Sequence, residues 1–140
     1  MNEAVELSAR EKLVLALRLI DFYLRQMEGK DYSSHTLEAI VVHNYSPSNP
    51  SLMAVRVNRS LEDRDDYSSS EADAVWNLAF VLDNLFMQSL DRDKDFGELP
   101  QEGELIDSVT ALLENKEGSS FYSVVQLRKL AEEAVTLRKH

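Results

Sequence analysis

The chain has 140 residues and a formal net charge of −10, with 44% hydrophobic and 29% charged residues. That length is typical of one domain, and the composition is that of a folded rather than a disordered chain. The absence of cysteine excludes a disulfide framework, a thiolate zinc site and a cysteine nucleophile. We therefore expect a single globular domain over residues 1–140 that folds without a cross-link or a metal.

The first twenty residues do not have the pattern of a targeting signal. Glu3 and Glu6 place negative charge where a signal peptide needs a positive region. The apolar run that begins at Leu13 is interrupted by Arg18, so it is too short for a membrane span, which takes about 20 residues. We expect a cytoplasmic protein.

A helix is predicted over residues 9–28. Ser8 and Glu11 have the spacing of a capping box, and Gly29 is placed to take the left-handed conformation that ends a helix. Its apolar stripe, with intervals of three and four residues, consists of Leu13, Leu17, Ile20, Leu24 and Met27. Further apolar positions widen this face, which indicates burial on more than one side, in the core or against a second chain.

An antiparallel β-hairpin is predicted next, over about residues 37–58. Its first half contains a run of β-branched residues, and its middle holds two prolines in a turn-forming sequence. In its second half the side chains alternate, with Met53, Val55 and Val57 toward one side and Arg56 toward the other. A lone hairpin is marginally stable in water, so we expect it to pack against helices.

Three more helices are predicted in the rest of the chain. Apolar residues recur at helical spacing in residues 71–90, which Ser70 can cap, and Trp76, Phe80 and Met87 lie off the main stripe. A short helix is expected over residues 104–115 and a last one over residues 119–139. The predicted fold is therefore α+β and mainly helical, with about four helices packed against one antiparallel hairpin.

Self-association is one prediction about partners. The helices over residues 9–28 and 71–90 have apolar faces wider than a single core contact needs, and surplus apolar area favours association. We expect a homodimer with one of these two helices in its interface.

The negative charge is concentrated in one third of the chain. Residues 59–105 hold thirteen acidic and four basic side chains, a balance that repels nucleic acid and attracts a basic protein. We expect a non-enzymatic interaction module, such as an inhibitor, an immunity-type protein, a chaperone or an adaptor, whose sharper form is a mimic of nucleic-acid charge. The same charge also fits a purely solubilising role. The proposed contact residues are Glu62, Asp63, Asp65, Asp66, Asp91, Asp93 and Asp95.

The stretch DRDKDFGELPQE, residues 91–102, has part of the spacing of an EF-hand calcium loop. Ligand positions 1, 3, 5 and 12 of such a loop correspond to Asp91, Asp93, Asp95 and Glu102. Phe96, however, stands where the loop needs glycine for its sharp turn, and Pro100 restricts it further. We expect a solvated acidic connector without a metal ion. The alternative function is a small metal-dependent domain, calcium-binding or catalytic, that uses this loop.

The sequence contains no recognisable catalytic or cofactor motif. The three histidines lack the spacing of a paired-histidine metal site, and the four glycines do not form a phosphate loop. No serine stands in a nucleophile elbow. His43, within the predicted hairpin, is the histidine that a catalytic alternative would use. We expect no enzyme activity and no cofactor.

Overall fold

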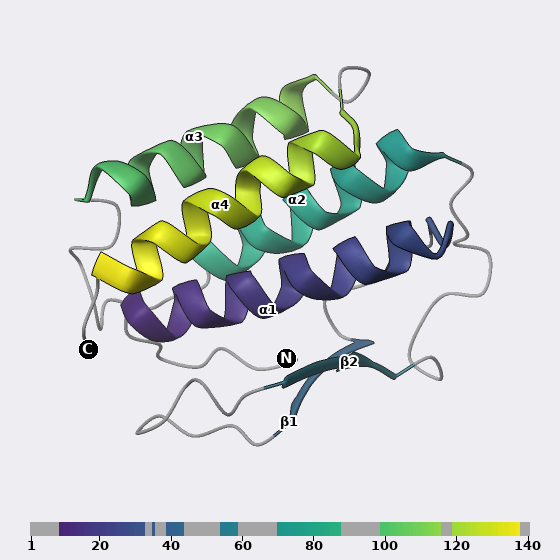
Figure 1. Ribbon diagram of the computed structural model, residues 1–140, viewed down its shortest axis with the longest axis horizontal. Helices are drawn as coiled ribbons and strands as arrows, with labels where there is room; N and C mark the ends of the chain where they lie inside the picture. Colours follow the sequence, from purple (N-terminus) through teal and green to yellow (C-terminus); the bar gives the residue numbers. More distant parts are fainter. Residues whose placement is uncertain are drawn as a thin grey trace.

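The computed structural model describes residues 9–32, 35, 39–43, 54–58, 70–87, 99–115 and 119–137. They form four helices and a two-stranded antiparallel sheet, which confirms the predicted fold class. The elements in chain order are α1 (Ala9–Glu28), β1 (Ile40–His43), β2 (Ala54–Val57), α2 (Glu71–Met87), α3 (Pro100–Glu114) and α4 (Phe121–Leu137). Figure 1 shows the helices as a bundle, with the sheet on the α1 side. Within the described ranges, no helix is both long and apolar enough to cross a lipid bilayer.

One apolar core joins the four helices. α1 packs against α4 and α2, while α3 packs against α2 and α4. The buried residues of α1 extend well beyond its predicted stripe and include Leu13, Val14, Leu15, Ala16, Leu19, Ile20, Tyr23 and Met27. The wide apolar face of α1 is thus covered within the chain. The width of this face therefore no longer supports a homodimer interface on α1. The homodimer itself stays a prediction.

The sheet has the side-chain alternation predicted for its second strand. Val55 pairs with Val42 across the two strands, and both side chains pack against the core. Arg56 is exposed, and its Nε donates a hydrogen bond to Nε2 of His43. Met53, the other predicted inward residue before Val55, lies outside the described residues. The register places the apolar side of β2 against α1, the helix that it contacts.

The end of α1 differs from the prediction by one position. The left-handed residue is Lys30, with φ 66°, and not Gly29. The N–H of Asp31 donates to the carbonyl of Gln26 at 2.9 Å, and the N–H of Lys30 donates to the carbonyl of Met27 at 3.0 Å. These are the two bonds of a Schellman motif, whose left-handed position follows the cap residue. Gly29 is the cap residue, so the left-handed position that follows it is occupied by Lys30.

α3 begins four residues earlier than predicted. Pro100 is its first residue and Leu99 its N-cap. This position suits proline, because an N–H in the first turn of a helix has no carbonyl partner within the helix and the N–H that proline lacks is therefore not missed. Glu102 consequently lies in the first turn and is fully buried. The expected solvated connector is therefore wrong for its last residues, while residues 91–98 lie outside the described part of the chain.

Polar side chains connect the ends of the helices. Ser70 caps α2 as predicted, since its Oγ accepts a hydrogen bond from a main-chain N–H in the first turn at 3.2 Å. The carboxylate of Glu71 reaches another helix and accepts the N–H of Phe121, the first residue of α4, at 2.6 Å. Nζ of the buried Lys12 donates to the carbonyl of Phe86 near the end of α2 at 3.2 Å. The negative charge of Glu71 lies at the N-terminus of α4 and the positive charge of Lys12 lies near the C-terminus of α2, and each is favourable there because it opposes the partial charge of the helix end.

Candidate functional site

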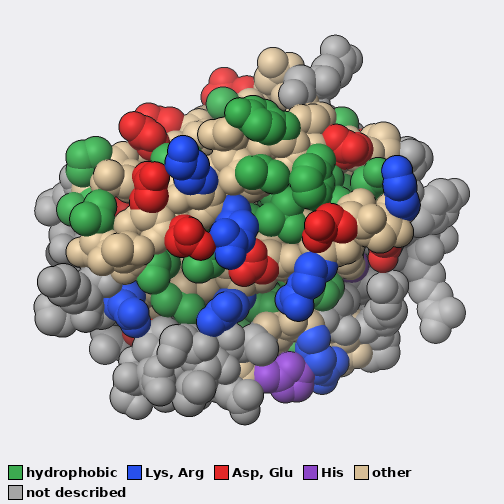
Figure 2. Space-filling view, viewed as in Figure 1, with side chains coloured by type: hydrophobic (Ala, Val, Ile, Leu, Met, Phe, Trp, Pro, Cys, Tyr) green, Lys and Arg blue, Asp and Glu red, His purple; other side chains and the backbone are tan. Residues whose placement is uncertain are grey.

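The helices of the bundle differ in the sign of the charges that they carry. α2 carries three acidic side chains and α3 carries four, and neither helix contains Lys or Arg, whereas α1 and α4 carry both signs. In Figure 2 the basic side chains lie mostly along the lower part of the face, where α1 runs in Figure 1. The predicted contact residues, which lie outside the described ranges, are Glu62, Asp63, Asp65, Asp66, Asp91, Asp93 and Asp95.

Three carboxylates form a stripe on the solvent side of α3. Glu104, Asp107 and Glu114 are exposed, and intervals of three and seven residues place them on one side of a helix. Leu105 and Val109 occupy the other side, in the core. We call Glu104, Asp107 and Glu114 the acidic ridge. The acidic segment predicted from the sequence ends at residue 105, so it includes Glu104 but not Asp107 or Glu114. The exposure of the three depends on which side of α3 the bundle covers.

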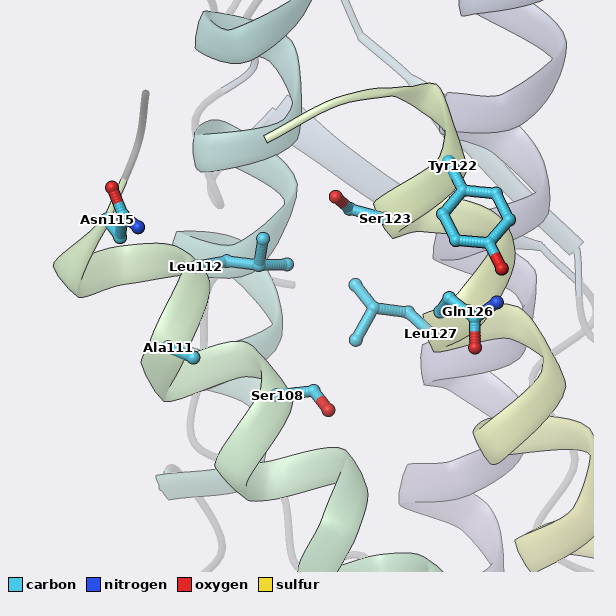
Figure 3. A pocket seen from close by; sticks show the side chains of 8 residues that line it. All are labelled: Ser108, Ala111, Leu112, Asn115, Tyr122, Ser123, Gln126 and Leu127. Carbon is cyan, nitrogen blue, oxygen red and sulfur yellow. The ribbon is translucent and has the colours of Figure 1, made fainter. Parts of the chain in front are cut away.

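Two hollows lie along the seam between α3 and α4. The first, the Tyr122 hollow, has a volume of about 320 Å³ and is lined by Ser108, Ala111, Leu112, Asn115, Tyr122, Ser123, Gln126 and Leu127. Figure 3 shows Leu112 and Leu127 pointing toward one another from the two helices. Tyr122, on α4, is 68% exposed. None of the eight residues is Asp, Glu, His, Lys or Arg, so the hollow suits an apolar group and lacks the acid–base groups that catalysis commonly uses.

The second hollow, the Leu137 hollow, lies at the opposite end of the same seam. Its volume is also about 320 Å³, and it is lined by Gln101, Glu132, Glu133, Thr136 and Leu137. Leu137 is 52% exposed. Each end of the seam therefore presents a large apolar side chain to solvent.

An aromatic pair on α2 lies beside α3. The rings of Trp76 and Phe80 stack with centroids 5.6 Å apart. Nε1 of Trp76 donates a hydrogen bond to the carbonyl of Leu113 at 3.2 Å, so Trp76 helps to hold α3 in place. Phe80 is 45% exposed. It is the exposed large apolar side chain in the described part of α2, and the homodimer prediction now depends on this side of the protein.

A polar groove of about 400 Å³ lies between α1 and α4. Its lining residues are Arg18, Asp21, Leu24, Arg25, Glu28 and Arg128. Nε of Arg128 donates to Asp21 at 2.5 Å, and its Nη1 donates to Glu132 at 2.9 Å. The hydrogen bond with Asp21 raises the pKa of Arg128 above its ordinary value, and the ion pair links α4 to α1. Because the groove mixes both signs of charge, it favours neither anions nor cations.

His35 is buried in a polar cluster that the sequence did not reveal. Its ring packs on those of Phe22 and Tyr23, and its Nε2 donates to Oε1 of Gln26 at 2.7 Å. The side chain of Asn77 binds the backbone of His35 as a neighbouring strand would: Oδ1 accepts its N–H at 2.8 Å and Nδ2 donates to its carbonyl at 3.0 Å. The hydroxyl of Tyr23 also donates to Oδ1 of Asn77. The cluster attaches the chain at His35 to α1 and α2.

The residues of the metal-dependent alternative do not come together in the described part of the chain. Across the described ranges, no group of three or more His, Asp or Glu is arranged to hold a metal ion. His43 is exposed on β1, and Glu102 is buried in α3. The three aspartates of the calcium-loop pattern lie outside those ranges.

Comparisons of this chain with protein-family models, with curated proteins and with solved structures give no match.

Proposed function

We propose that this protein is a non-enzymatic interaction module that engages a basic surface of a partner protein through the acidic ridge. The observation that carries the proposal is the placement of Glu104, Asp107 and Glu114 in one exposed stripe. They lie on the half of the bundle whose two helices contain no Lys or Arg. A stripe of one sign with no opposite charge on its own helix keeps its field directed to solvent, where it can act on a partner.

The ridge is expected to strengthen binding mainly by raising the association rate and by orienting the partner. Exposed ion pairs contribute about 0–1 kcal/mol each because water and salt screen them. Clustered charge nevertheless raises the frequency of productive encounters with an oppositely charged surface. Asp91, Asp93 and Asp95 precede α3 in the sequence, and Glu62, Asp63, Asp65 and Asp66 precede α2. We propose these seven acids as further contacts.

A mimic of nucleic-acid charge is the sharper form of the proposal. In that form the partner is a protein whose basic groove otherwise holds phosphate groups, and the carboxylates of the ridge occupy the same groove. Duplex DNA would then compete with this protein for its partner, and the competition would weaken as salt is raised.

The test is capture of partners from a cell lysate by the immobilised protein at low and at physiological salt. The variants are E104Q/D107N/E114Q, which neutralises the ridge, and the matched single substitutions D107N and E28Q. Glu28 is an exposed acid on α1, away from the ridge. We expect wild type and E28Q to retain a basic protein that salt releases, with less retained by D107N and least by the triple variant. Equal retention by the triple variant would contradict the proposal.

A further inference from the structure

The seam between α3 and α4 is a candidate site for a third helix, because it has a hollow at each of its two ends. Figure 1 shows the two helices side by side, and the two hollows place the start of α3 near the end of α4 and the end of α3 near the start of α4. α3 and α4 are therefore antiparallel neighbours. Grooves between helices accept the side-chain ridges of another helix, which is a recurrent way of binding an amphipathic segment.

The residues of α3 that line the two hollows set a spacing along the seam. Leu112 lines the Tyr122 hollow and Gln101 lines the Leu137 hollow, eleven residues apart on α3. At a rise of about 1.5 Å per residue, the hollows lie about 16 Å apart along the seam. Eleven residues are also about three turns of a docked helix, so side chains eleven positions apart would both point into the seam.

The charge along the seam favours a basic occupant. Glu104 precedes the groove-lining Ser108 by one helical turn, and Glu132 and Glu133 line the Leu137 hollow. In the described part of α4 the bases are Arg128 and Lys129, and Arg128 is bound to Asp21 and Glu132. The occupant is therefore expected to carry Lys or Arg between its apolar positions.

One polar atom at the Leu137 hollow also fits such an occupant. Oε1 of Gln101 is buried and has no hydrogen-bond donor among the described residues. A buried acceptor without a donor costs free energy, and a lysine or arginine side chain at this end of the seam would supply one after a small shift of Gln101.

We infer that the α3–α4 seam binds a basic amphipathic helix of the partner, with two apolar side chains eleven residues apart seated in the Tyr122 and Leu137 hollows. This inference depends on the proposed function, since it names the element of the basic partner that is bound. The two hollows hold the helix through buried apolar contacts, and the acidic ridge next to the seam guides it there. Tyrosine is one of the residue types most often found where truncation costs large binding energy.

The test uses a fluorescently labelled 16-residue peptide made of alanine and lysine with leucine at positions 3 and 14. One control peptide has leucine at positions 3 and 10, and a second has glutamate in place of lysine. Binding is measured by fluorescence anisotropy with wild type, Y122A, L137A and F80A. Phe80 serves as the matched control because it is exposed and apolar but lies on α2, outside the seam.

We expect the first peptide to bind with micromolar affinity and each control peptide to bind at least tenfold more weakly. Y122A and L137A should each weaken binding about tenfold, because each truncates a side chain that the docked helix would bury, while F80A should leave it within about twofold. Equal binding of the two leucine spacings, an equal loss in F80A, or no binding by wild type would overturn the inference. So would a wild-type homodimer that Y122A converts to a monomer, because a second copy would then occupy the seam.

The same experiment separates this inference from the proposed function. If E104Q/D107N/E114Q weakens binding of the peptide but Y122A and L137A do not, the acidic ridge remains a binding surface and the seam does not. If capture from lysate is unaffected by the triple variant while the peptide still requires Tyr122 and Leu137, the proposed function fails and the groove remains.

Discussion

The side chain of Asn77 offers the sharpest test of how the bundle holds His35. The substitution N77A removes the three hydrogen bonds that Asn77 makes with the backbone of His35 and the hydroxyl of Tyr23. All three residues are buried. Each buried polar group left unsatisfied costs about 1–3 kcal/mol, so we expect N77A to lower the free energy of unfolding by about 3 kcal/mol or more. That loss is a large part of the 5–15 kcal/mol typical of a domain.

N84A is the matched control for this substitution. Asn84 lies two turns further along α2, and its Nδ2 donates to the carbonyl of Phe80 at 2.8 Å in an exposed position. Water can replace that bond, so we expect N84A to cost less than about 0.5 kcal/mol. Urea denaturation followed by circular dichroism measures both, and unchanged slopes would show that the two variants unfold from the same folded state. Equal stability of N77A and N84A would refute the structural role assigned to Asn77.

Three further expectations concern the hairpin, the end of α1 and the acidic stretch before α3. V55D places a carboxylate against the core and should cost about 2 kcal/mol or more in urea denaturation, while R56A should stay within about 0.5 kcal/mol; equal effects would mean that the register is wrong. K30G should stabilise the protein by about 1 kcal/mol, because the left-handed conformation at this position disfavours a side chain. G29A should be tolerated, since the added Cβ would lie 3.5 Å from the nearest carbonyl oxygen. A stabilising G29A with a destabilising K30G would contradict the Schellman assignment. Calcium at millimolar concentration should raise the melting temperature no more than magnesium does, because only specific binding to the folded state stabilises through mass action; a saturable calcium-specific heat in calorimetry would favour the metal-dependent alternative.

The sequence predicted the elements whose formation depends on residues close to one another in the chain. The helices follow from apolar residues at intervals of three and four, and the second strand follows from the alternation around Val55 and Arg56. The left-handed turn was assigned to Gly29 instead of Lys30 because residue preference alone does not fix which position follows the cap. The start of α3 was missed for a related reason: Pro100 was interpreted as a loop residue, although proline also suits the first position of a helix.

Features that depend on tertiary packing were not accessible from the sequence. Nothing near His35 in the chain indicates burial, because its partners Tyr23 and Asn77 belong to two different helices. The seam hollows arise where α3 meets α4, and the exposure of Tyr122 depends on which side of α4 the bundle leaves open. Asn77 is buried in the structure but lies off the apolar stripe that the sequence of α2 shows, so it gave no signal of its partners.

The rate at which the partner associates tests the central claim most directly. Stopped-flow fluorescence with the captured partner gives association rate constants for wild type and for E104Q/D107N/E114Q at low and at high ionic strength. If the acidic ridge steers a basic surface, the triple variant should associate about tenfold more slowly at low salt, and the two proteins should converge as salt screens the charges. Equal association rate constants at every salt concentration would contradict the claim that the ridge is the binding surface.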